Sequence, residues 1–68
     1  MAEPALGNTL KEARTAAGLT QAELAERVGV SRKTINTVEN GVFIPSTLLA
    51  LKLAAALRTK VEDLFYLP

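Results

Sequence analysis

The stretch from Thr20 to Gly41, TQAELAERVGVSRKTINTVENG, predicts two short helices joined by a tight turn. Thr20 can cap the first helix, and Glu23 follows at the spacing of a capping box. Gly29 stands where a left-handed residue would end this helix, and Val30 is the hydrophobic residue just beyond it. The apolar face between these two ends consists of Leu24, Ala25 and Val28.

The second helix of this stretch has an unusual polar face. Ser31 can cap it, Asn40-Gly41 ends it, and Ile35 and Val38 point inward. The opposite face is almost free of acids and consists of Lys33, Asn36, Thr37 and Asn40, with Arg32 in the first turn. Cations in a first turn oppose the helix dipole by roughly 0.3–1 kcal/mol each. Two adjacent basic residues alone favour a solvated face, whereas the whole face also fits a surface that meets an anion and reads base edges.

Three groups of residues in this stretch resemble the Cro and lambda-repressor type of helix-turn-helix, also called the XRE family. They are Thr20-Gln21-x-x-Leu24-Ala25, Gly29-Val30-Ser31 and Ile35-x-x-x-Glu39-Asn40-Gly41. The resemblance spans nearly the whole chain, from Leu6 to Leu67. It implies a compact all-α domain of five helices, here residues 1–68, that binds double-stranded DNA as a small transcriptional regulator, a repressor by expectation.

The resemblance also implies which residues touch DNA, because the second helix of such a pair enters the major groove while the first crosses the backbone. The recognition helix is then Ser31–Asn40. Carried over by position, the base contacts are Arg32, Lys33, Thr37, Ser31 and Asn36. The phosphate contacts are Thr20, Gln21 and Asn40, the first two at a helix amino end where free amides can hold an anion. Thr20 and Ser31 are also caps, and stability alone would explain either of them.

The amino-acid composition argues against several other classes of function. A chain of 68 residues without cysteine or histidine cannot form disulfides or the usual zinc sites, and it lacks most nucleophile-plus-base pairs. We therefore expect no enzymatic activity, no cofactor, no metal and no small-molecule ligand. The net charge is only +1, but three cations and no carboxylate lie between Arg27 and Thr37. Affinity for DNA would come from this local patch and would weaken with salt.

The chain shows no sign of a membrane or secretory segment. Its start, MAEPALGNTL, lacks a basic region followed by an apolar run, and no apolar stretch reaches the length of a membrane span. We expect a soluble protein of the cytoplasm, associated with the nucleoid when bound to DNA.

Three further helices are expected around the central pair. Apolar residues recur at helical spacing from Leu6 to Ala17, with Pro4 suited to a first turn. Ser46 caps a helix from Thr47 to about Arg58 that is apolar almost all round. Such a helix must be covered on most sides, so we expect it to be the central core helix or to lie partly at a subunit contact. A second capping box, Thr59-Lys60-Val61-Glu62, predicts a short last helix.

Two charges lie at the edges of apolar stripes, Arg14 in the first helix and Glu39 in the recognition helix. From the residues alone, two unrelated surface charges are the simpler interpretation. The family resemblance implies instead that the two form a structural ion pair.

The C-terminal residues Phe65, Tyr66 and Leu67 carry more apolar surface than a short terminus readily hides. They either fold back on the core of their own chain or form a homodimer contact, and the sequence favours neither. A homodimer would bind a palindromic operator. A rival function also stays open at this point, a protein-interaction module of the same fold, such as an antitoxin or an adaptor to the transcription machinery.

Overall fold

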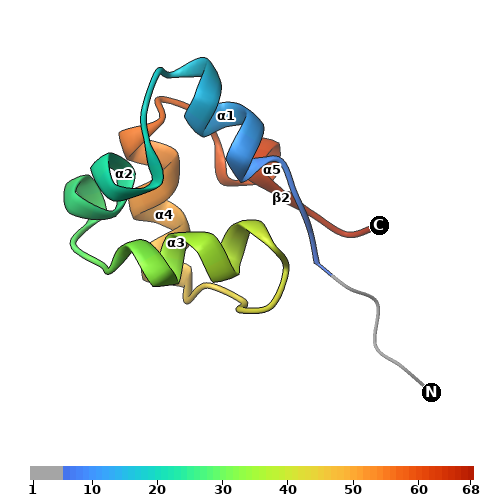
Figure 1. Ribbon diagram of the computed structural model, residues 1–68. Coiled ribbons are helices and arrows are strands. Elements are labelled where there is room, and N and C mark those ends of the chain that lie inside the picture. The colour runs from blue at the N-terminus through green and yellow to red at the C-terminus, as the bar shows by residue number, and fades with distance from the viewer. Residues whose placement is uncertain (1–5) are drawn as a thin grey trace.

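The computed structural model describes residues 6–68, which form five helices and a small two-stranded sheet (Figure 1). The helices are α1 (Leu10–Ala16), α2 (Gln21–Val28), α3 (Arg32–Glu39), α4 (Thr47–Ala56) and α5 (Val61–Leu64). The strands are β1 (Gly7–Asn8) and β2 (Phe65–Tyr66), which pair antiparallel. The expected five-helix domain is therefore confirmed, and the sheet is an addition that the sequence did not predict.

One hydrophobic core receives a fully buried side chain from every helix. These side chains are Leu10, Leu24, Ile35, Leu53 and Leu64. α4 packs against both α2 and α5, and in Figure 1 it passes behind α2 and α3. Burial of each such side chain stabilises the fold by about 1.5–3 kcal/mol. Because all five helices share this core, α3 is packed with one side buried and the opposite side exposed.

The two central helices have the ends that the sequence predicts. The Thr20 hydroxyl accepts a hydrogen bond from the Glu23 amide at 3.0 Å, and the Glu23 carboxylate accepts one from the Thr20 amide at 2.9 Å. Gly29 is left-handed with φ of 75°, which turns the chain sharply after α2. The Ser31 hydroxyl then accepts a hydrogen bond from the Thr34 amide at 3.1 Å and caps α3.

The first helix begins later than predicted. The expected start at Leu6 is wrong, since residues 7–8 form β1 and α1 starts at Leu10. The Thr9 amide donates to the Leu64 carbonyl at 2.9 Å, and its hydroxyl donates to the Asp63 carbonyl at 2.6 Å. These hydrogen bonds hold Thr9 against the C-terminal part of the chain, so the residues before it do not continue the helix. The expectation for Pro4 lies outside the described residues.

The second predicted capping box is also wrong. α4 ends at Ala56, and Arg58 adopts the left-handed conformation with φ of 53°. α5 is preceded by Lys60, which makes no capping hydrogen bond through its side chain. The Thr59 hydroxyl bonds to the Asp63 carboxylate at 3.3 Å, one residue beyond the predicted partner. The left-handed turn at Arg58 shifts the register that simple spacing suggested.

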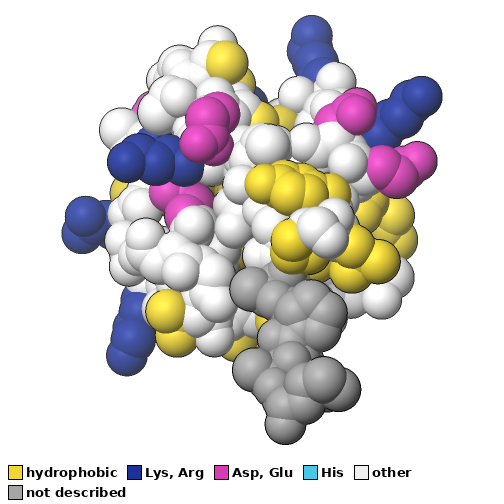
Figure 2. Space-filling model, turned by 90° about the vertical axis from the view of Figure 1, so that its right-hand side faces the viewer, with side chains coloured by type: hydrophobic (Ala, Val, Ile, Leu, Met, Phe, Trp, Pro, Cys, Tyr) yellow, Lys and Arg dark blue, Asp and Glu magenta, His cyan; other side chains and the backbone are white. Residues whose placement is uncertain are grey.

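Within residues 6–68, large apolar side chains remain exposed between residues 42 and 51 and at the C-terminus. α4 is not covered on most sides, because Leu48 and Leu51 are exposed although Leu49 and Leu53 are buried. At the C-terminus, Phe65 packs against the core, whereas Tyr66 and Leu67 are exposed. Figure 2 faces the side where β2 lies in Figure 1 and shows hydrophobic side chains gathered in one area of that face.

Among residues 6–68, no helix combines the length and the apolar character needed to cross a lipid bilayer.

The capping box makes part of the stability depend on pH. Hydrogen bonds from the Thr20 amide and hydroxyl lower the pKa of Glu23 below its ordinary value of 4.5. A lowered carboxyl pKa adds stability above the ordinary pKa, and this is lost as the pH falls through the folded-state pKa. We expect the melting temperature of the parent to exceed that of Glu23→Gln at pH 7.

The difference should shrink toward zero once the pH is below the folded-state pKa. Thermal unfolding of both proteins between pH 7 and pH 2, followed by circular dichroism, measures it. A difference that is the same at every pH would contradict this account of the cap.

Candidate nucleic-acid interface

A buried ion pair lies beneath the helix-turn-helix. Arg14 Nε lies 2.6 Å from Glu39 Oε2, and Arg14 Nη2 donates to Glu39 Oε1 at 3.2 Å. Arg14 Nη1 donates to the Leu19 carbonyl at 2.9 Å. Only 10% of the arginine side chain and 3% of the glutamate side chain are exposed. The structure thus brings the two charges together, in a two-pronged contact that joins α1 to the end of α3.

The partners of Arg14 keep it charged although it is buried. Its hydrogen bond to Glu39 raises the pKa of the guanidinium, while burial acts in the opposite direction and is smaller. The nearby negative charge of Glu39 raises the pKa further. Each buried charge is therefore compensated by a directed partner, which is the condition for a buried pair to be tolerated.

The same carboxylate also holds Gln21, the first residue of α2. Gln21 Nε2 donates to Glu39 Oε1 at 3.1 Å. Glu39 therefore links α1, α2 and α3 through one side chain. An amide nitrogen carries two hydrogens, so Gln21 can keep this bond and still donate to a phosphate. No local sequence pattern predicts this link, because Gln21 and Glu39 are far apart in the chain.

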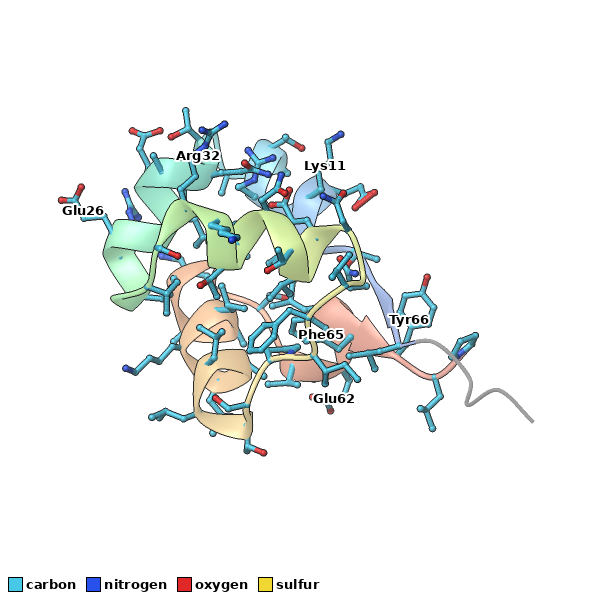
Figure 3. All side chains as sticks on the ribbon, turned by 60° about the horizontal axis from the view of Figure 1, so that its bottom comes forward. Lys11, Glu26, Arg32, Glu62, Phe65 and Tyr66 are labelled. Atoms are coloured by element: carbon cyan, nitrogen blue, oxygen red, sulfur yellow. The ribbon has the colours of Figure 1, made fainter. Side chains whose placement is uncertain are left out.

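Arg32, Lys33 and Asn36 lie exposed on one side of α3. Together with Gln21 they line an open depression of about 400 Å³ between α2 and α3. Figure 3 shows Arg32 at the beginning of α3, on the side next to α2. The Arg14–Glu39 contact is the one ion pair within residues 6–68, so neither cation of this face is paired there. The structure brings four of the predicted DNA contacts into one basic surface.

The other residues predicted to contact DNA already use some of their polar groups in hydrogen bonds within the chain. The Thr37 hydroxyl donates to the Thr34 carbonyl at 2.9 Å, and Asn40 Nδ2 donates to Asn36 Oδ1 at 3.2 Å. The hydroxyls of Ser31 and Thr20 each accept a capping hydrogen bond. None of these four lines the depression. Of the predicted base contacts, Arg32 and Lys33 are the freest to bind an external group.

Asn8 is a residue near this interface that the sequence analysis missed. Its side-chain amide donates to the Val38 carbonyl at 3.2 Å and so holds β1 against the end of α3. No pattern signals this bond, because it depends on the unexpected strand. Elsewhere in the described range, no group of three or more Asp or Glu side chains is placed to hold a metal ion.

Two capped helices joined by a left-handed glycine, with an acid-free cationic face on the second helix, define a helix-turn-helix DNA-binding domain. The helix-turn-helix family model HTH_3 matches residues 10–64, and the chain belongs to this family. An uncharacterised HTH-type transcriptional regulator, YgzD of Bacillus subtilis (strain 168), is 47% identical over 60 residues, which cover 88% of this chain and 91% of that protein.

Solved structures agree with this assignment. The restriction-modification controller protein C.AhdI from Aeromonas hydrophila superposes with a TM-score of 0.75 at 41% identity, covering 79% of this chain and 82% of that chain. A putative DNA-binding protein from Bacteroides fragilis superposes with a TM-score of 0.82 at 26% identity, covering 90% and 98%. The chain is thus an HTH-type transcriptional regulator that binds DNA, in a family that is not enzymatic.

The buried pair predicts a large loss of stability when one partner is removed. Arg14→Ala leaves Glu39 buried without its cation, and this should lower the free energy of unfolding by about 3–5 kcal/mol. Lys11→Ala is the matched control, because Lys11 is an exposed cation of the same helix. Urea denaturation of both variants gives the comparison. If Arg14→Ala unfolded at the same urea concentration as Lys11→Ala, the stabilising role of the pair would be wrong.

Proposed function

We propose that the protein is a sequence-specific transcriptional repressor that binds a palindromic operator as a homodimer, with α3 in the major groove. The observation that carries this proposal is the exposed surface formed by Arg32, Lys33 and Asn36 beside Gln21. An α-helix with its side chains is about 10–12 Å in diameter, and the major groove is about 12 Å wide, so a helix such as α3 fits into it.

The chemistry of α3 suits the edges of base pairs. Arg32 and Lys33 lie in its first turn and can donate to the O6 and N7 atoms of guanine, so we expect a guanine in each half-site. The amide of Asn36 can pair with adenine. Ser31 and Thr37 flank these residues and would add contacts through hydroxyl groups that are already partly used within the helix.

The phosphate backbone would be held at both ends of this surface. Gln21 and Thr20 lie at the amino end of α2, where unpaired backbone amides and the helix dipole favour an anion. Asn40 lies at the other end of α3. These contacts set the register of the protein on the duplex but do not read sequence. A repressor then needs no further chemistry, because a bound dimer can block access to a promoter.

Selection from a random duplex pool tests this function. Purified protein is mixed with the pool at low salt, and the retained DNA is sequenced after several rounds. The proposal predicts an inverted repeat with half-sites about one helical turn, or 34 Å, apart. Absence of enrichment with protein shown to be folded would contradict it and would favour the rival function, a module that binds another protein.

The two classes of contact predict different mutant behaviour on the selected operator. Arg32→Ala and Lys33→Ala should each cost about 1–3 kcal/mol and relax the sequence preference, whereas Gln21→Ala should weaken binding to all sequences alike. Lys60→Ala is the control for loss of charge, because Lys60 is exposed in the connection between α4 and α5.

Fluorescence anisotropy on the operator and on a scrambled duplex gives the measurement, and thermal melting shows whether Gln21→Ala stays folded without its bond to Glu39. Equal losses on both duplexes for all of Arg32→Ala, Lys33→Ala and Gln21→Ala would overturn this division of roles.

A further inference from the structure

The Glu39 carboxylate has more partners than an ion pair requires. Arg14 already supplies two donors, Nε to Oε2 at 2.6 Å and Nη2 to Oε1 at 3.2 Å. Gln21 Nε2 supplies a third donor, to Oε1 at 3.1 Å. Gln21 is only half-buried, and it lines the basic depression together with Arg32 and Lys33. A stabilising pair explains the first two donors, but it does not explain why the third comes from the DNA-binding face.

The third hydrogen bond fixes which end of the Gln21 amide meets the carboxylate. A glutamine amide has a carbonyl oxygen, which accepts, and an NH₂ group, which can donate twice. An ionised carboxylate can only accept, so the NH₂ group must turn toward Glu39 and the carbonyl oxygen must turn away from it. One hydrogen of Gln21 is used in this bond. The other hydrogen is left for an acceptor outside the protein.

Gln21 is held at a helix end that already favours an anion. It is the first residue of α2, and the capping hydroxyl of Thr20 takes up the amide of Glu23. The backbone amides of Gln21 and Ala22 therefore have no partner within the helix. A side-chain N–H held in place beside them adds one more donor for a phosphate oxygen.

Arg14 makes this arrangement compatible with a phosphate. A lone carboxylate behind Gln21 would repel a phosphate strongly, because water screens charges poorly in a protein interior. The guanidinium of Arg14 lies 2.6 Å from that carboxylate, and its hydrogen bond to Glu39 raises its pKa and keeps it charged. The two charges cancel, so the pair can hold the amide of Gln21 without repelling DNA.

We propose that Glu39 is a positioning residue for DNA binding, whose carboxylate holds the Gln21 amide in the orientation that donates to a backbone phosphate. Only 3% of the Glu39 side chain is exposed, so it would act through Gln21 and not by touching DNA. A free glutamine loses rotamer freedom when it binds, whereas a glutamine that is already held loses little. The inference rests on one part of the proposed function, the phosphate contact of Gln21.

Two double variants separate positioning from stability. The Met/Met variant, Arg14→Met with Glu39→Met, replaces the pair by apolar side chains, a change that buried ion pairs often tolerate. The Met/Gln variant, Arg14→Met with Glu39→Gln, also removes both charges but keeps a carbonyl oxygen that can accept from Gln21. The two proteins differ in one side chain, and neither has a charge at these two positions.

The two variants should rank in opposite orders for stability and for DNA affinity. The Met/Gln variant buries an amide that lacks some of its hydrogen-bond partners, so it should unfold at a lower urea concentration than the Met/Met variant. It should nevertheless bind DNA more tightly, by about 2- to 12-fold, because Gln21 is still held. A role of Glu39 in stability alone predicts no such reversal, so Met/Met binding as tightly as Met/Gln would overturn the proposal.

Fluorescence anisotropy on a labelled duplex of mixed sequence, at low salt, measures this affinity, because phosphate contacts do not depend on sequence. Circular dichroism confirms that each variant is folded under these conditions. Gln21→Ala then completes a mutant cycle in both backgrounds. We expect it to weaken binding in the parent and in the Met/Gln variant, and to change little in the Met/Met variant, where the contact is already lost.

The salt dependence of binding shows whether the cations of α3 have stayed in place. Loss of a contact from a neutral amide releases no counterion, so the slope of log affinity against log salt should be the same in the parent and in both double variants. A shallower slope in the Met/Met variant alone would mean that Arg32 or Lys33 has left the phosphates. That result would attribute the lost affinity to a rearranged fold and overturn the positioning role.

A measurement on the parent needs no substitution at all. Gln21 is the only glutamine in the chain, so its side-chain amide can be identified by nuclear magnetic resonance. We expect its ¹⁵N order parameter without DNA to be near that of rigid backbone, about 0.85. A value below about 0.6 would show that the amide is mobile before DNA binds, which contradicts positioning by Glu39.

Failure of this proposal can be told apart from failure of the proposed phosphate contact. If Gln21→Ala binds the duplex as tightly as the parent, the phosphate contact is wrong and the positioning role falls with it. If Gln21→Ala binds more weakly but the two double variants bind alike, the phosphate contact stands and the role of Glu39 is wrong.

Discussion

The buried contact of Arg14 with Glu39 is the constraint on which the DNA-binding face depends. Glu39 is the last residue of α3, and its carboxylate accepts hydrogen bonds from Arg14 of α1 and from Gln21 of α2. A small hydrophobic core is not directional, so it leaves packed helices some freedom to slide. Directed bonds to one nearly unexposed side chain remove that freedom and fix α2 and α3 at one angle. Breaking them would both destabilise the fold and move Gln21 relative to Arg32.

Local signals in the sequence account for most of the fold. The caps at Thr20 and Ser31 and the left-handed Gly29 act within a few residues, so they can be recognised without knowing the rest of the structure. The sheet between β1 and β2 could not be predicted in this way, because two residues at each end of the chain carry no strand pattern. The shifted start of α5 has a similar cause, since Arg58 takes a conformation that usually favours glycine.

The candidate site was predictable in composition but not in geometry. Helical spacing placed Arg32, Lys33 and Asn36 on one face, and they do share the depression with Gln21. Spacing also placed Thr37 and Asn40 there, yet their side-chain groups bond within or beside α3. The pairing of Arg14 with Glu39 came from the family resemblance and not from the residues. Long-range contacts of this kind depend on how the helices pack, and the packing cannot be inferred from a single sequence.

The net charge is small but the cations are locally concentrated, and this distribution bears on how the regulator would bind DNA. Under the proposed function, affinity would arise from a few groups on α3 and at the start of α2, so the position of each cation would matter more than the total charge. The central claim is that α3 reads bases in the major groove. Methylation interference on the selected operator tests this claim directly, because dimethyl sulfate methylates guanine N7 in the major groove and adenine N3 in the minor groove. The account predicts that a methylated guanine N7 in each half-site prevents binding, and that Arg32→Ala or Lys33→Ala loses this sensitivity. Interference from adenine N3 alone would contradict it.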